Sequence, residues 1–179
     1  MLDKLRTYFP LVEDIKEENL RRAVLETFVE GLEKGGWIPE DLKKIPATLL
    51  IPNCPFSFLE HTNAVTACAL AMAREMKKIY GDRFLVDFDI LIAGGLLHDV
   101  GKLLEIERTP EGGFRRSRSG RLLRHPLSGL ALAALRGAPD TVLHIIACHS
   151  REGDAGKRTT EGILIHHADF SNFDPFLSS

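Results

Sequence analysis

The stretch FDILIAGGLLHDVGK, residues 88–102, decides how this chain folds. Its first ten residues are apolar on nearly every side, which predicts a helix buried in the middle of a domain. Asp87 is a favourable N-cap for this helix, and Gly101 is a favourable end. Two polar side chains, His98 and Asp99, nevertheless stand near the end of the stretch. A buried carboxylate needs a compensating positive charge, and the adjacent imidazole favours a metal ion for that role.

Helical periodicity continues on both sides of this segment. Apolar residues recur at steps of three and four, which is the period of an amphipathic helix. The pattern predicts helices over residues 15–32, 57–79, 88–100, 124–135, 139–148 and 160–170. Because no run shows the sustained alternation of a strand, we expect a single all-α domain, a bundle of six to seven helices.

Two longer connections separate the predicted helices. Residues 37–53 contain three prolines and predict a connection with one short helical turn. Residues 109–122 contain three glycines and four arginines, which predicts a long, mobile loop without regular structure. We therefore divide the chain into an N-terminal helix with its connection, residues 1–55, and a helical metal-binding core, residues 56–179, which form one compact domain.

Composition excludes several classes of protein. The chain has 179 residues, 44% of them hydrophobic, and a formal net charge of −2. A domain of this size buries roughly 70% of the surface of its unfolded chain and needs no disulfides. Its three cysteines are widely spaced, which suits neither a disulfide framework nor a CxxC zinc site. The near-neutral charge argues against binding to duplex nucleic acid.

The N-terminal sequence and the length of the apolar runs indicate where in the cell the protein is expected. The first residues mix charges and lack the apolar core of a signal peptide. The longest apolar run, residues 90–97, is far shorter than the roughly 20 residues that span a bilayer. We therefore expect a soluble, cytoplasmic protein with no membrane partner. The apolar face of the helix over residues 15–32 would pack on its own domain or on a partner subunit, which leaves a homodimer open.

Several histidines lie on the inner faces of predicted helices. Helical spacing places His61, His125 and His149 on the apolar faces of three different helices. Asp169 shares the inner face of the last helix with Ile165. His98 and Asp99 at the end of the buried helix complete the set. Five helices thus offer six candidate metal ligands: His61, His98, Asp99, His125, His149 and Asp169.

In chain order the six candidates form the pattern H…HD…H…H…D. This order, with GLLHDVGK around His98-Asp99 and HHADF around Asp169, resembles the HD superfamily of metal-dependent phosphohydrolases. The interposed histidines, in RHPLSG and ACHSREG, match the subset of this superfamily that holds two metal ions. The resemblance covers residues 56–173 and implies an HD-type helical bundle.

The resemblance also implies which of the six candidates would hold each of two metal ions. One metal would be held by His61, His98, Asp99 and Asp169. The second would be held by Asp99, which bridges, with His125 and His149. Four imidazoles and two carboxylates suit iron, manganese, nickel, cobalt or zinc, whereas magnesium prefers more oxygen ligands. Two such ions would acidify a bridging water, and the resulting hydroxide is the expected nucleophile.

Cationic side chains that follow His98 and Asp99 in the sequence are candidates for binding phosphate. Lys102 lies one turn after His98 and is placed to bind a phosphate oxygen or the leaving group, as the lysine of HDxGK does in related families. We therefore assign Asp99 and Lys102 as the catalytic residues. We expect the arginine-rich loop to act as a lid that grips phosphate, although a charged loop that is merely solvated is the alternative. The candidate substrate-binding residues are Lys102, Arg116, Arg118 and Arg121.

The leading functional hypothesis is hydrolysis of a phosphate ester or phosphoanhydride in a nucleotide or another small phosphorylated metabolite. One alternative is oxidation by a di-iron pair, because the myo-inositol oxygenase group has similar six-ligand sites. A second alternative is a non-catalytic sensing module, against which the presence of all six ligands argues. The sequence after His149 lacks the GYP motif of cyclic dinucleotide phosphodiesterases, so we do not expect that specificity.

Overall fold

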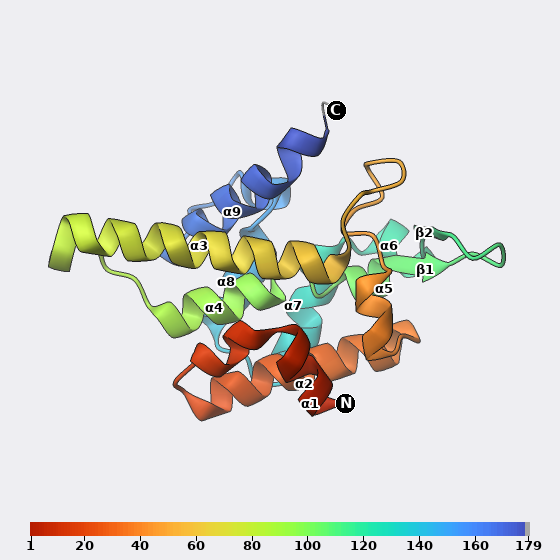
Figure 1. Cartoon of the computed structure of the whole chain (residues 1–179), viewed down its shortest axis with the longest axis horizontal. Helices are drawn as coiled ribbons and strands as arrows, with labels where there is room; N and C mark the ends of the chain where they lie inside the picture. Colours follow the sequence, from red (N-terminus) through yellow and green to blue (C-terminus); the bar gives the residue numbers. More distant parts are fainter. Residues whose placement is uncertain (178–179) are drawn as a thin grey trace.

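Helices make up most of the structure, a computed structural model that describes residues 1–177. The α-helices are α1 (Leu2–Tyr8), α2 (Glu18–Gly35), α3 (Phe58–Tyr80), α4 (Phe88–Leu97), α5 (Lys102–Glu105), α6 (Arg118–Leu122), α7 (His125–Leu135), α8 (Asp140–Cys148) and α9 (Thr160–Phe173) (Figure 1). The predicted all-α fold class is confirmed. Among the described residues, no helix is both long enough and apolar enough to cross a membrane.

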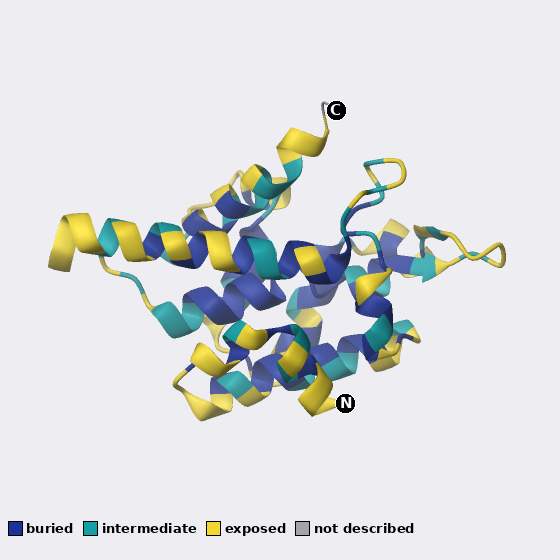
Figure 2. Cartoon of the chain, in the orientation of Figure 1, coloured by how far each residue is buried: buried dark blue, intermediate teal, exposed yellow. Residues whose placement is uncertain are grey.

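The predicted buried helix lies at the centre of the fold. α4 contacts α2, α3, α8 and α9, and every residue from Leu91 to Leu97 is buried. In Figure 2 α4 is dark blue over most of its length, whereas the free end of α3 is yellow. Asp87 caps α4 by accepting hydrogen bonds from the backbone N–H groups of Asp89 and Ile90. Because other helices surround α4, the residues that directly follow it lie in the interior of the domain.

Two long helices cover α4. Figure 1 shows α3 running across the molecule, with α4 below it and α9 above it. α3 begins with a capping box, in which Ser57 accepts from the backbone N–H of Glu60 and the Glu60 carboxylate accepts from the backbone N–H of Ser57. This cap fixes the first turn of α3, which carries His61 on its buried side.

The N-terminal helix packs on its own domain. The apolar face of α2 is buried against α4, α5 and α7. Phe28 on this face stacks on Phe9, with ring centroids 4.2 Å apart, and meets the edge of Phe58 at 6.5 Å. These contacts join the N-terminal segment to the main core, so α2 does not need a partner subunit to cover its apolar face. The homodimer stays a prediction.

The segment predicted to be an unstructured loop is folded. Strand β1 (Ile106–Arg108) pairs antiparallel with β2 (Phe114–Arg116), with Ile106 opposite Arg116, and α6 follows directly. Gly112 forms the turn with a φ of 87°, a conformation that glycine adopts without strain. The expectation of a structureless loop over residues 109–122 is therefore wrong. Strands of three residues are too short to show an alternating pattern in the sequence.

The chain after α4 touches the start of α7 through backbone atoms. A Cβ at Gly101 would lie 2.1 Å from the carbonyl oxygen of His125 and 2.6 Å from the backbone nitrogen of Gly129. Real Cβ atoms do not approach backbone atoms so closely. Only glycine at position 101 therefore allows the residues before it and the start of α7 to lie side by side.

We expect Gly101→Ala to lower the free energy of unfolding by about 2 kcal/mol or more, because the new methyl group must push two backbone segments apart. Urea-induced unfolding followed by circular dichroism measures this change. Gly156→Ala is the matched control, since a Cβ there meets only the carbonyl oxygen of Gly153 at 3.6 Å. Equal stability of the two variants would contradict the role assigned to Gly101.

Candidate metal centre

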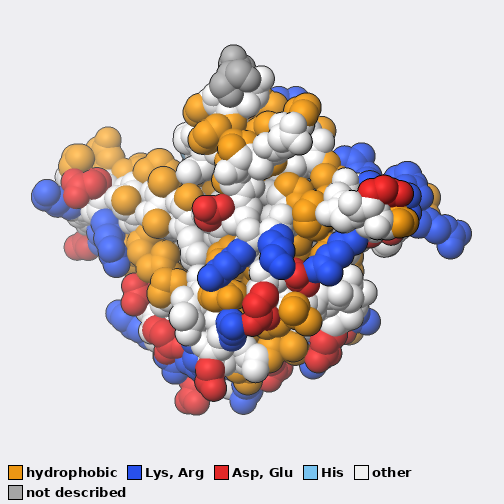
Figure 3. Space-filling view, turned by 45° about the vertical axis from the view of Figure 1, so that its right-hand side comes forward, with side chains coloured by type: hydrophobic (Ala, Val, Ile, Leu, Met, Phe, Trp, Pro, Cys, Tyr) orange, Lys and Arg blue, Asp and Glu red, His pale blue; other side chains and the backbone are white. Residues whose placement is uncertain are grey.

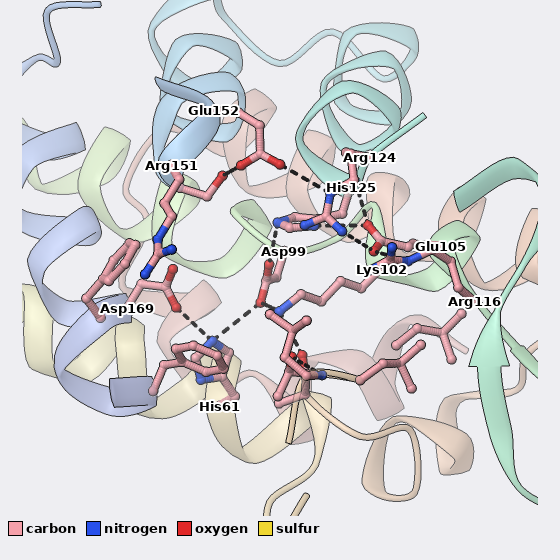
Figure 4. A pocket seen from close by; sticks show the side chains of 18 of the residues that line it. His61, Asp99, Lys102, Glu105, Arg116, Arg124, His125, Arg151, Glu152 and Asp169 are labelled. Carbon is pink, nitrogen blue, oxygen red and sulfur yellow. Dashed lines mark hydrogen bonds and ion pairs between the residues drawn. The ribbon is translucent and has the colours of Figure 1, made fainter. Parts of the chain in front are cut away.

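Five segments of the chain bring the six predicted ligand candidates together. His98 and Asp99 directly follow α4 and are 0% and 1% exposed. His61 comes from the first turn of α3, and His125 is the first residue of α7. His149 caps the end of α8, and Asp169 lies on α9. Figure 4 shows His61, Asp99, His125 and Asp169 pointing toward one another from these different elements.

The carboxylate of Asp99 divides the histidines into two pairs. Its Oδ2 lies 3.4 Å from His61 Nε2 and 3.3 Å from His98 Nε2. Its Oδ1 lies 3.3 Å from His125 Nε2 and 3.6 Å from His149 Nε2. Within each of the two groups, the ligand atoms all lie within 4.8 Å of one another. Each group is thus compact enough to hold one metal ion, with Asp99 shared.

Asp169 lies beside His61, a member of the first of these groups. Its Oδ1 lies 3.0 Å from His61 Nε2. Burial raises the pKa of Asp169, but the hydrogen bond from His61 outweighs this effect and the pKa falls to about 2. The side chain is therefore an anion at neutral pH, which is the form that binds a cation.

In His98 and His149, a hydrogen bond from Nδ1 leaves Nε2 free to act as a ligand. His98 Nδ1 donates to the carbonyl oxygen of Gly95 at 2.6 Å, and His149 Nδ1 donates to that of Ile146 at 2.9 Å. A neutral imidazole that donates from Nδ1 carries its lone pair on Nε2. His98 Nε2 is buried and has no hydrogen-bond partner within the described chain. A buried acceptor without a partner is unfavourable, and a metal ion at this point would satisfy it.

The charges of the centre also fit a bound cation. Burial raises the pKa of Asp99, but Lys102 and the surrounding histidines hold it well below its usual value. Burial lowers the pKa of His125, which keeps that ring neutral at neutral pH. Lys102 Nζ lies 2.5 Å from Asp99 Oδ2 and donates to the carbonyl oxygen of Ala47 at 2.7 Å. Neutral imidazoles and ionised carboxylates are the donor set that divalent transition metals prefer.

Glu105 is a buried residue of the site that the sequence did not reveal. Its Oε2 accepts from the backbone N–H of His125 at 2.8 Å and from His125 Nδ1 at 3.0 Å. Its Oε1 accepts from Arg124 at 2.9 Å and lies 3.3 Å from Arg116 Nε. One carboxylate therefore holds a metal-ligand candidate and two arginines. The sequence signal was weak, because Glu105 is a single acidic residue beside Leu103, Leu104 and Ile106.

A cavity of about 700 Å³ opens onto the centre. Its lining includes Asp99, Lys102, Asp169 and three arginines, Arg116, Arg124 and Arg151. Figure 4 shows Arg124 and Arg116 on the side of Glu105, and Arg151 beside Glu152. Figure 3 shows a row of Lys and Arg side chains across the middle of the face in view, with hydrophobic groups beside them.

The predicted substrate-binding residues lie in different places. Lys102 and Arg116 are part of the cavity lining. Arg118 and Arg121 lie on α6, both exposed, and are not among the described residues that line the cavity. Arg121 instead donates to the carbonyl oxygen of Arg116 at 2.9 Å. A binding role for Arg118 and Arg121 stays a prediction.

These features define a class of protein: an all-α domain in which four histidines and two carboxylates converge below a cavity that Lys102 and three arginines help to line. The chain belongs to the HD domain family, whose sequence profile matches residues 58–170. A dihydroneopterin 2′,3′-cyclic phosphate phosphodiesterase from Methanocaldococcus jannaschii is 30% identical over 164 residues, a match that covers 89% of this chain and 65% of that relative. The chain thus spans slightly less than two thirds of the relative's length. No solved structure matches the chain.

We expect Glu105→Gln to weaken the binding of manganese about 10-fold, because the His125 ring loses the carboxylate that orients it. Calorimetric titration of chelator-treated protein with manganese measures the affinity. Circular dichroism spectra of the two proteins show whether the fold is retained.

Glu107→Gln is the matched control for this experiment. Glu107 is two residues away on β1, and its carboxylate pairs with Arg115 Nε at 2.7 Å on the outside of the hairpin. This variant should bind manganese as the unaltered chain does. An equal loss of affinity in both variants would mean that Glu105 acts only through its negative charge and not through its hydrogen bond with His125.

Proposed function

We propose that this protein is a metal-dependent phosphohydrolase that cleaves a phosphate ester of a nucleotide or another small phosphorylated metabolite. The observation that carries the proposal is the geometry of Asp99, whose two oxygens face two separate histidine pairs below a cavity that Lys102 and three arginines help to line. Membership of the HD domain family and the phosphodiesterase named among its relatives support the same reaction class.

The proposed cofactor is a pair of divalent transition-metal ions, iron, manganese, nickel, cobalt or zinc. One ion would be held by His61, His98, Asp99 and Asp169. The other would be held by Asp99, His125 and His149. When bound, such ions supply Lewis-acid charge to the phosphoryl group and lower the pKa of a water molecule so that hydroxide attacks at neutral pH.

The chain's own cations bind and orient the phosphate. Lys102 Nζ lies within 2.5 Å of Asp99, so a phosphate oxygen at the centre would lie beside it. Arg124 donates to Glu105 at 2.9 Å and to Glu152 at 3.2 Å, which fixes its guanidinium before substrate arrives. Burial raises the pKa of Glu152, but hydrogen bonds from Ser150 and Arg124 bring it to about 2. A guanidinium held between two anions loses little side-chain entropy when it binds phosphate.

The proposed first substrate is a cyclic phosphate diester. The relative from Methanocaldococcus jannaschii is named for a 2′,3′-cyclic phosphate, and a diester of this kind carries a single negative charge on its phosphate. Lys102, Arg116, Arg124 and Arg151 provide four cations along the cavity for this charge and for the charge that develops during hydrolysis. The arginines of the lining favour a substrate that carries phosphate, and the phosphodiesterase among the relatives favours hydrolysis over the di-iron oxygenase alternative.

The proposal predicts that anaerobically purified protein contains about two transition-metal ions per chain and hydrolyses dihydroneopterin 2′,3′-cyclic phosphate or a nucleoside 2′,3′-cyclic phosphate. Elemental analysis and phosphate-ester assays on the same sample test both statements. Asp99→Ala should lose metal and at least 100-fold in activity, because it removes the shared ligand. Two iron ions without hydrolysis would favour the oxygenase, and a chain without metal or activity would favour a binding module.

A second prediction concerns Arg116, one of the arginines that line the cavity. Arg116→Ala should raise KM about 10-fold with a smaller change in kcat, because it removes a charged contact to the substrate that is present before and during the reaction. Steady-state kinetics with the cyclic diester measure the two constants. Arg115→Ala is the control, since Arg115 is the preceding residue of β2 and pairs with Glu107 outside the cavity. An unchanged KM for Arg116→Ala would contradict a role in binding.

A further inference from the structure

The cavity has an apolar side that the proposed chemistry does not use. Phe56, Phe170 and Phe173 line it, together with Leu49. Phe170 and Phe173 are three residues apart on α9, so they share one face of the helix. Phe56 reaches the same cavity from the connection before α3. Aromatic groups from two separate segments thus converge next to the metal centre.

This aromatic wall, formed by Phe56, Phe170 and Phe173, lies at one end of the cavity and Arg116 and Arg124 lie at the other. The ring of Phe56 stacks near that of His61, with centroids 5.9 Å apart. Phe170 follows Asp169 directly in the chain. Figure 4 places His61 and Asp169 on one side of Asp99 and the two arginines on the opposite side.

The wall is not part of the structural core. Core phenylalanines such as Phe9, Phe28 and Phe58 are 0% exposed. Phe56, Phe170 and Phe173 are only half-buried, although they lie in a concave part of the molecule. Apolar side chains left partly exposed inside a cavity are typical of a ligand-binding surface.

Neighbouring side chains pack on Phe170, a ring of the wall that lies on α9. The ring of His166 packs on Phe170 with centroids 4.6 Å apart, and His166 Nδ1 donates to the carbonyl oxygen of His149 at 2.6 Å. The Arg151 guanidinium lies 6.0 Å from the centroid of the Phe170 ring, and both side chains line the cavity. A ring whose orientation is fixed before binding gains more from stacking, because no rotamer freedom is lost.

The size of the cavity agrees with a ligand larger than phosphate. A volume of about 700 Å³ lies in the range of pockets that bind whole cofactors or nucleotides, and one phosphate group fills only a small part of it. The organic part of the substrate would therefore extend from the cations toward the aromatic wall. Planar aromatic rings are the groups that stack best on phenylalanine.

We propose that Phe56, Phe170 and Phe173 form a subsite for a planar aromatic ring carried by the phosphate ester. The inference rests on the proposed phosphohydrolase function and names the part of the substrate that the centre itself does not recognise. The ring stacks on the aromatic wall, while the phosphate lies between Lys102 and the arginines. The wall therefore selects substrates by their organic group.

Two substrates that differ only in the ring test this subsite. Guanosine 2′,3′-cyclic phosphate carries a planar base, and methyl β-ribofuranoside 2′,3′-cyclic phosphate has the same ribose and diester without the base. The metal-loaded protein should show a kcat/KM at least 10-fold higher for the guanosine ester. Phe170→Ala should lower kcat/KM for that ester about 10-fold, mainly through KM, and leave the methyl riboside within twofold. Phe173→Ala should have the same selective effect, which guards against a folding defect in one variant.

Ile163→Ala is the matched control for the variants on α9. Ile163 lies on the same helix, is 45% exposed and is not among the described residues that line the cavity, so both substrates should be unaffected. Equal kcat/KM for the two substrates, or an equal loss for both in Phe170→Ala, would overturn the subsite and leave the proposed hydrolase function intact.

Binding distinguishes failure of the subsite from failure of the hydrolase function. If neither ester is hydrolysed, the proposed reaction fails for this class of diester, and calorimetric titration then tests the subsite alone. Tighter binding of the guanosine ester that Phe170→Ala removes would support the subsite even then. Equal binding of the two esters, or no binding of either, would overturn it.

Discussion

The rest of the structure depends on one buried negative charge, the carboxylate of Asp99. An ionised carboxylate at the end of an apolar helix is strongly unfavourable unless positive or hydrogen-bonding groups surround it. The fold meets this requirement by directing α3, α7, α8 and α9 toward the end of α4, each with one ligand candidate. The same convergence that stabilises the charge also places it between the two histidine pairs that are proposed to hold metal ions, so stability and the proposed chemistry have a common origin.

A second carboxylate connects this centre to the surface. Glu105 uses one oxygen for His125 and the other for Arg124, so the position of a ligand candidate and that of a phosphate-binding candidate are set by the same group. The hairpin contributes Arg116 to the same contact. The segment that follows the buried helix is therefore part of the candidate site, because its short elements place Arg116 close to the ligand candidates.

The periodicity of apolar residues in the sequence predicted the helices and the residues on their buried faces. The all-α class, the central helix and the inward position of His61 follow from apolar residues at helical spacing. The hairpin was missed because its strands are too short, and Glu105 was missed because its partners lie about twenty residues away in the chain. Arg124 and Arg151 were not chosen over Arg118 and Arg121 because only tertiary packing decides which side chains of a cationic segment turn toward a cavity.

The backbone contact at Gly101 divides the site into a part that is fixed and a part that is free to vary. No side chain fits between the turn after α4 and the start of α7 unless the two segments move apart, so a substitution at position 101 would change the spacing of the ligand candidates. Phe173 lines the cavity instead, and within the described chain it neither adjoins a ligand candidate in sequence nor stacks on one, so an exchange there reshapes the cavity. In evolutionary terms, such a protein can acquire a new substrate through substitutions along one wall while its metal chemistry is inherited unchanged.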